Sequence, residues 1–175
     1  AASLGEYEMA VPIIKNLKRR NPGLPFTTVV TFFSPSGAEN VSNDESSLAD
    51  EVCYLPIDTR NNARKLITTL KPTMVFFMKY EFWWHYFHEL NKRHIPFFVL
   101  AARFYPSQFF FKWYGKSFTK ILSLPNKLFV QRQNDVILGR KLRLTNLEVG
   151  GDSRFQRTKQ LLEEEIDLSW VEQFK

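Results

Sequence analysis

The chain alternates short apolar runs with longer amphipathic segments, and this alternation constrains its fold more than any other feature. Runs such as 74–78 (MVFFM) and 96–101 (PFFVLA) are apolar throughout, which is typical of strands buried on both faces of a sheet. The segments between them carry apolar residues three and four apart, as helices do. Strands separated by helices predict an α/β fold, a doubly wound parallel sheet with helices on both faces.

The same patterns place the individual elements. We expect strands at 26–33, 52–55, 74–78, 96–101, 128–130 and 147–149. We expect helices at 6–20, 61–70, 81–94, 107–122, 133–142 and 155–165. Ligands on such sheets bind at the carboxyl ends of the strands. The loops expected to carry function are therefore 34–37, 58–61, 79–81, 102–107, 131–133 and 150–154.

The composition is that of a soluble globular domain, with 44% hydrophobic and 24% charged residues. The single cysteine, Cys53, excludes an internal disulfide and favours a reducing compartment. Net charge is +6, but residues 90–134 contain no acid and eight bases: Lys92, Arg93, Arg103, Lys112, Lys116, Lys120, Lys127 and Arg132. Such a stretch is either a solvated basic face or a surface that attracts polyanions or an anionic membrane.

Residues 103–120 (RFYPSQFFFKWYGKSFTK) combine this positive charge with an excess of aromatic side chains. On an α-helix, lysines four apart would form a basic stripe beside more aromatic residues than one core face needs, which is typical of a helix lying in a lipid interface. A buried helix with a solvated lysine edge is the alternative. Base stacking is a third use of such residues, but no nucleic-acid motif accompanies them, and we expect no nucleic-acid partner. The predicted membrane or acceptor surface comprises Phe109, Phe111, Lys112, Trp113, Lys116 and Lys120.

Neither a nicotinamide cofactor nor a P-loop nucleotide has support, because the sequence lacks both GxGxxG and GxxxxGK[ST]. We expect no cofactor.

One helical segment has a spacing of side chains that can bind Zn²⁺ on one face: Glu81, His85, His88 and Glu89. However, the segment HYFHE matches neither HExxH nor HxxEH, and we predict no metal site.

Taken in order, several loops resemble one family. The chain resembles the N-terminal domain of 3-deoxy-D-manno-octulosonic acid (Kdo) transferases over residues 1 to about 157. The motifs that carry this resemblance are AASLGE, TFFSPSG, LPIDT, KYEFW, AARFYPSQFFFKWYG, FVQ and GDSRF. These glycosyltransferases of lipopolysaccharide biosynthesis modify lipid A precursors in Gram-negative bacteria. The resemblance implies a GT-B fold, in which two Rossmann-like domains face a cleft. The first domain mainly binds the acceptor, and the second mainly binds CMP-Kdo.

The resemblance also implies how this chain is organised. Residues 1–160 would be the Rossmann-like acceptor-binding domain, and residues 161–175 a terminal helix or the start of a connection to a C-terminal donor domain absent from the chain. We expect such a fragment to be inactive alone. The implied partners are a lipid A precursor, CMP-Kdo through the missing domain, and an anionic membrane surface. The implied location is the cytoplasmic face of the inner membrane, with the membrane anchor also absent.

Position by position, Glu6 falls on the family's catalytic carboxylate, the general base, and Glu81 on a second acidic position of the site. The implied substrate-binding residues are Ser3, Ser34, Ser36, Gly37, Lys79, Arg103, Ser107, Gln131, Asp152 and Arg154. Trp84 and Gln156 depart from the family pattern, where a proline and an acid are common. Two alternatives stay open: another GT-B-like glycosyltransferase or sugar-nucleotide epimerase domain, and a basic membrane-surface module.

Overall fold

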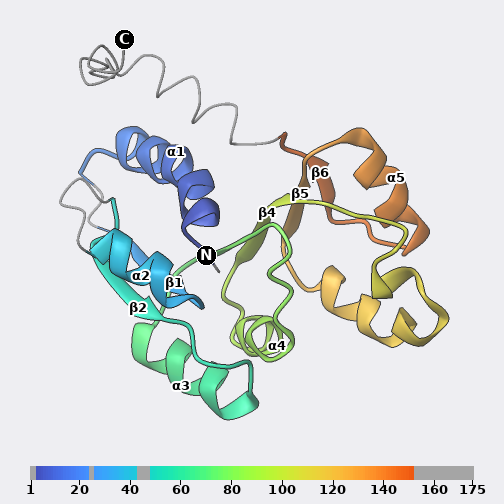
Figure 1. The fold of residues 1–175 in the computed structure, drawn as a ribbon, viewed down its shortest axis with the longest axis horizontal. Helices are drawn as coiled ribbons and strands as arrows, with labels where there is room; N and C mark the ends of the chain where they lie inside the picture. Colours follow the sequence, from blue (N-terminus) through green and yellow to red (C-terminus); the bar gives the residue numbers. More distant parts are fainter. Residues whose placement is uncertain (1–2, 24–25, 43–47, 152–175) are drawn as a thin grey trace, which may run out of the picture.

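A computed structural model describes residues 3–23, 26–42 and 48–151 of the chain (Figure 1). Within these ranges, every strand pairs in parallel with its neighbours. One sheet has the order β3 (Val75–Met78), β4 (Phe97–Ala102), β5 (Lys127–Val130) and β6 (Leu147–Val149), and a second sheet pairs β1 (Val29–Phe32) with β2 (Glu51–Tyr54). The parallel α/β prediction is confirmed, although the described strands divide into two hydrogen-bonded sheets.

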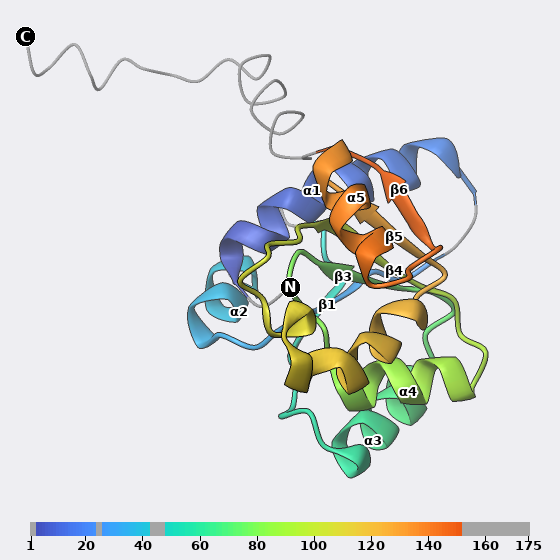
Figure 2. The ribbon, with the colours of Figure 1, turned by 90° about the vertical axis from the view of Figure 1, so that its right-hand side faces the viewer.

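Helices lie on both faces of the larger sheet (Figures 1 and 2). Side chains alternate between faces along a strand, and β3 shows this directly. Phe77 enters the main core, where its ring lies 4.8 Å from that of Phe87 on α4 (Trp84–Lys92). Met78 faces the other way and packs against Met9 of α1 (Leu4–Arg20). Helix α3 (Arg60–Leu70) joins α4 on the first face, and α5 (Gln133–Lys141) follows β5.

A helix that the sequence did not predict, α2 (Pro35–Ser42), begins directly after Ser34. Its first residues are typical of a turn, but proline is well tolerated in the first turn of a helix, and burial of Ala38 and Val41 holds the segment. Gly37 lets α2 approach its neighbours closely. A Cβ built there would lie 2.5 Å from Cδ1 of Phe32 and 3.2 Å from the backbone nitrogen of Leu4.

The prediction of one α-helix over 107–122 is wrong. The segment forms two 3₁₀ helices, η1 (Phe109–Phe111) and η2 (Trp113–Ser123), separated by Lys112 in an extended conformation. Gly115 permits this because a Cβ there would overlap the carbonyl oxygen of Phe109. A 3₁₀ helix has three residues per turn, so residues four apart do not align. Lys112, Lys116 and Lys120 are all exposed but form no single stripe.

Most other boundaries shift by one or two residues, and two differences are larger. The first strand covers only 29–32 of the predicted 26–33. Helix α4 begins at Trp84 and not at 81. At this start, the Asp58 carboxylate accepts hydrogen bonds from the backbone N–H groups of His85 and Tyr86, at 3.0 and 3.3 Å. The predicted functional loop at 58–61 thus supplies a helix cap. The predicted helix at 155–165 and the domain boundary at 160 lie outside the described residues. None of the helices in the described ranges is long and apolar enough to cross a membrane.

Candidate functional site

Glu81 is a buried carboxylate at the carboxyl end of β3, with 6% of its surface exposed. The chain leaves β3 through Lys79, whose φ of 51° turns the backbone so that Glu81 folds back onto the strand. Its Oε2 accepts a hydrogen bond from the backbone N–H of Met78 at 2.9 Å. Burial raises the pKa of Glu81, an effect that this hydrogen bond opposes.

Glu6 lies in the first turn of α1, three residues after the N-cap Ser3. The Ser3 hydroxyl donates a hydrogen bond to Glu6 Oε2 at 2.7 Å, which fixes the carboxylate beside the helix start. The partial positive charge of the helix N-terminus favours an anion at this position. Glu6 is half-buried, whereas Glu81 is buried. Ser3 is therefore placed to orient the predicted base.

The two predicted catalytic residues come together. Burial is the largest cause that raises the pKa of Glu81, and the negative charge of Glu6 raises it further. Helix α1, which carries Glu6, packs on β3. That packing is made by Met9, Met78 and Ala101. A half-exposed carboxylate beside a buried one of raised pKa is an arrangement used for acid–base chemistry.

The loop after β1 reaches the same place. Gly37 lies against the backbone of Leu4, next to the start of α1. Phe33, at the end of β1, has its ring 5.5 Å from that of Trp83, in the loop after Glu81. The backbone of Ser34 begins α2 by accepting a hydrogen bond from Ala38 at 3.4 Å. Of the predicted residues of this loop, Gly37 is therefore the one that contacts the start of α1.

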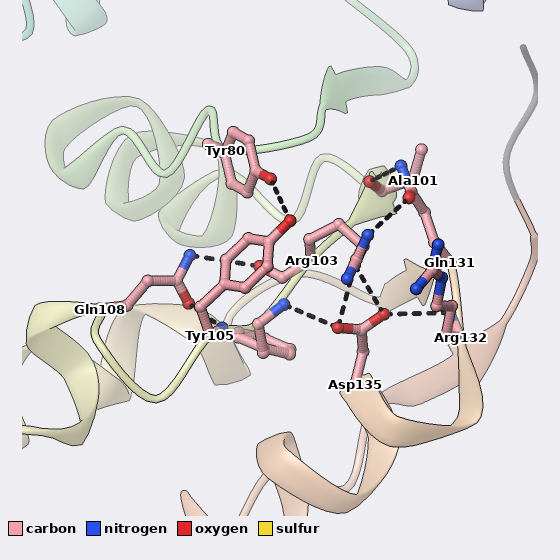
Figure 3. A network of polar contacts seen from close by, with 9 residues as sticks. Tyr80, Ala101, Arg103, Tyr105, Gln108, Gln131, Arg132 and Asp135 are labelled. Carbon is pink, nitrogen blue, oxygen red and sulfur yellow. Dashed lines mark hydrogen bonds and ion pairs between the residues drawn. The ribbon is translucent and has the colours of Figure 1, made fainter.

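A second polar cluster follows β4 and β5, built around Arg103 and Asp135 (Figure 3). Arg103 Nε donates a hydrogen bond to Asp135 Oδ1 at 3.2 Å and forms an ion pair with Oδ2 at 3.1 Å. Asp135 is 1% exposed and belongs to the first turn of α5. Gln131 is also buried, and its Oε1 accepts from Arg103 Nη1 at 3.4 Å. Two predicted substrate-binding residues, Arg103 and Gln131, are therefore in direct contact.

Tyrosines connect this cluster to the loop after β3. The Tyr80 hydroxyl donates to the Tyr105 hydroxyl at 3.2 Å, and Arg103 lies 5.0 Å from the centre of the Tyr105 ring. Burial and this hydrogen bond raise the pKa of Tyr80 to about 12, so Tyr80 stays a protonated donor at neutral pH. The Gln108 side chain stabilises the loop after β4, because it accepts a hydrogen bond from the backbone N–H of Tyr105 and donates one to the carbonyl of Arg103. Figure 3 shows the tyrosine hydroxyls pointing toward each other.

The remaining predicted residues are less closely involved. Within the described ranges, the Lys79 side chain makes no hydrogen bond or ion pair, including with Glu81. Ser107 is exposed in the loop before η1. Asp152 and Arg154 lie outside the described residues. The structure adds Tyr80, Tyr105 and Asp135, which the sequence patterns do not single out.

The helical residues with a zinc-like spacing are engaged elsewhere. Glu89 forms an ion pair with Arg93 at 2.7 Å, and His88 Nδ1 lies 2.7 Å from the carbonyl oxygen of Trp84. In the part of the chain that the structure describes, no group of three or more His, Cys, Asp or Glu side chains is arranged to hold a metal ion.

Comparison with known proteins identifies the family of the chain. A family model described as 3-deoxy-D-manno-octulosonic-acid transferase (kdotransferase) matches residues 1–157. The chain belongs to the Kdo transferase family. A 3-deoxy-D-manno-octulosonic acid transferase of Haemophilus influenzae is 34% identical over 105 residues, which is 59% of this chain and 23% of that protein. The chain thus matches less than a quarter of the length of this relative.

Membership of the Kdo transferase family confirms the predicted family. Glu6, Glu81, Arg103 and Gln131 all lie within the matched residues. Asp135 also lies there. In the sequence it is an ordinary acid in the first turn of a short helix, and only its burial against Arg103 distinguishes it.

Proposed function

We propose that this chain is the acceptor-binding part of a glycosyltransferase that moves Kdo from CMP-Kdo to a lipid A precursor, with Glu6 as the general base. The observation that carries the proposal is the pair formed by Glu6 and Glu81 at the carboxyl end of β3, in a domain of the Kdo transferase family. Donor binding is assigned to sequence outside this chain, and we expect the chain alone not to turn over.

The reaction needs a proton acceptor. An acceptor hydroxyl attacks the anomeric carbon of CMP-Kdo, a carbon–oxygen bond forms, and CMP leaves with the bonding electrons. The hydroxyl proton passes to Glu6. A positioned carboxylate contributes typically about 100- to 10,000-fold in rate by this route.

Glu81 supports this assignment through electrostatics. Because burial raises its pKa, Glu81 holds its proton at a higher pH than an ordinary glutamate does. Whenever Glu81 is protonated, it carries no charge that would repel a neighbouring carboxylate. The Ser3 hydroxyl donates a hydrogen bond to Glu6 Oε2, which holds this oxygen beside the start of α1.

The test is a donor comparison in the full-length enzyme. Purified protein is given a lipid A precursor with either CMP-Kdo or UDP-linked sugars, and the products are identified by mass spectrometry. We expect transfer of Kdo from CMP-Kdo and none from the UDP-sugars. Transfer from a UDP-sugar alone would assign the domain to another GT-B-like glycosyltransferase.

The exposed aromatic residues of η1 and η2 favour a membrane-facing role in the same enzyme. Trp113 is 84% exposed and Phe109 and Phe118 are about half exposed, with Lys112, Lys116 and Lys120 on the same segment. Aromatic and cationic side chains together suit the interface of an anionic bilayer. We therefore propose that this segment contacts the cytoplasmic face of the inner membrane, where the acceptor lies.

A further inference from the structure

Asp135 directs its carboxylate almost entirely at groups outside its own helix. Its Oδ1 accepts from the backbone N–H of Phe104 and its Oδ2 from that of Arg132, both at 3.0 Å. Both oxygens also face Arg103 Nε. A buried carboxylate is destabilising unless its acceptor sites are filled, and here they are filled by the loop after β4 and the start of α5. Asp135 thus fixes those two segments to each other.

The Arg103 side chain is held but not saturated. Arginine has five N–H donors, and the hydrogen bonds to Asp135 and Gln131 use Nε and one edge of Nη1. Within the described residues, no protein group accepts a hydrogen bond from Arg103 Nη2. The Arg103 side chain is 18% exposed, so part of it reaches the surface. The Tyr105 ring lies 5.0 Å from the guanidinium carbon and limits its movement (Figure 3).

An irregularity in β4 directs Arg103 to this place. The pairing of β4 with β5 shifts register between Val99 and Ala102, and Ala101 has a φ of 53°. Non-glycine residues rarely adopt this conformation, and β-bulges near functional sites serve to re-aim a side chain. The Ala101 carbonyl accepts a hydrogen bond from Gln131 Nε2 at 3.1 Å, so the residue that contacts Arg103 Nη1 also holds the bulge.

We propose that Asp135 is the positioning residue for Arg103, holding the guanidinium at the carboxyl ends of β4 and β5 so that its outer Nη edge binds an oxyanion. The oxyanion is a phosphate or carboxylate carried by one of the two substrates. Asp135 itself does not touch the substrate. This inference rests on the proposed function only in taking the strand ends as the place where substrate binds.

The kinetic test uses the full-length enzyme as wild type, Asp135→Asn, Arg103→Gln and the double variant. Arg103→Gln should raise the KM of the substrate that carries the oxyanion by about 10- to 100-fold, because a charge-assisted hydrogen bond is lost. Asp135→Asn should raise the same KM by about tenfold, and the double variant should be no worse than Arg103→Gln. Measuring KM separately for acceptor and donor identifies which one carries the group.

A merely structural role gives a different result. Thr59→Ala is the matched control, since the Thr59 hydroxyl caps α3 by accepting from Asn62 at 3.3 Å and has no link to Arg103. The control should lower Tm without changing either KM. If Asp135→Asn behaves in the same way, the proposal is overturned. Arg103→Lys tests whether the guanidinium itself is needed while Asp135 stays intact. A wild-type KM for both substrates in that variant would also overturn the proposal.

A readout independent of Kdo transfer separates this inference from the proposed function. In protein labelled with ¹⁵N-arginine, the Nε–H signal of Arg103, assigned by its loss in Arg103→Gln, should shift on addition of glucosamine 1-phosphate but not of glucosamine. In Asp135→Asn the phosphate-dependent shift should be lost. Such a shift in an enzyme that transfers no Kdo would retain the anion site and reject the proposed function. If the enzyme transfers Kdo but shows no shift, and both KM values are unchanged in Arg103→Gln, the anion site is rejected and the proposed function is retained.

Discussion

Burial raises the pKa of Glu81, in the loop between β3 and α4, and the charge of Glu6, in the first turn of α1, raises it further. Replacing Glu6 with Gln removes that charge, and the pKa of Glu81 should fall toward its ordinary value. Carboxyl-detected NMR titration measures this directly. Glu8→Gln is the matched control and should leave the titration of Glu81 unchanged. An unmoved Glu81 in the Glu6 variant would show that the two carboxylates do not interact.

Burial of Glu81 also predicts how stability depends on pH. Burial raises the pKa of Glu81 in the folded state above the ordinary glutamate value of 4.5, so the folded state keeps a proton that the unfolded state has lost. The free energy of unfolding should therefore fall as pH rises from about 4.5 through the raised pKa, and then level off. Glu81→Gln should abolish this contribution, as denaturant unfolding at several pH values would measure. Parallel pH profiles for variant and wild type would contradict the assignment.

Gly37 should be intolerant of a side chain. The added Cβ of Gly37→Ala would press on Phe32 and on the backbone of Leu4, and overpacking of this kind costs about 1–3 kcal/mol. Gly5→Ala is the control, because a Cβ there meets nothing within 4 Å. In a helix that change should be neutral or stabilising by about 0.5–1 kcal/mol. Equal Tm values for the two variants would argue against the close packing of α2 on α1.

The segment spanning η1 and η2 should bind anionic vesicles in a salt-sensitive way. Changing Lys112, Lys116 and Lys120 together to Glu should weaken binding by about 1 kcal/mol for each charge lost near the surface. The control reverses three exposed cations of α3 and its C-terminus: Arg64, Lys65 and Lys71. Vesicle sedimentation with phosphatidylglycerol mixtures measures both. If both variants lose vesicle binding equally, binding depends on net charge in general and not on the segment spanning η1 and η2.

The sequence predicts the strands well and the segments around η1 and α2 poorly, for physical reasons. Buried parallel strands are apolar throughout, so β3 and β4 are visible in the residues themselves. Helix α2 begins with Pro, Ser and Gly, and it is held by tertiary packing of Ala38 and Val41 rather than by helix propensity. The 3₁₀ geometry depends on the contact of Gly115 with the backbone of Phe109, which spacing cannot reveal.

The sequence likewise predicts some residues of the candidate site and misses others. Glu6, Glu81, Arg103 and Gln131 were expected from motifs, and the structure brings Glu6 to Glu81 and Arg103 to Gln131. Asp135 was not expected, because acids are common in the first turn of any helix. Its significance arises from burial among residues distant in the sequence, which only the folded chain contains.

The central claim is that Glu6 accepts the proton of the attacking hydroxyl. The most direct test is the kcat for Kdo transfer by the full-length enzyme carrying Glu6→Gln, beside Glu8→Gln on the same helix. We predict that Glu6→Gln lowers kcat by about 100- to 10,000-fold with the fold intact by circular dichroism, while Glu8→Gln stays close to wild type. Wild-type kcat in the folded Glu6→Gln enzyme would contradict the assignment of Glu6 as the base.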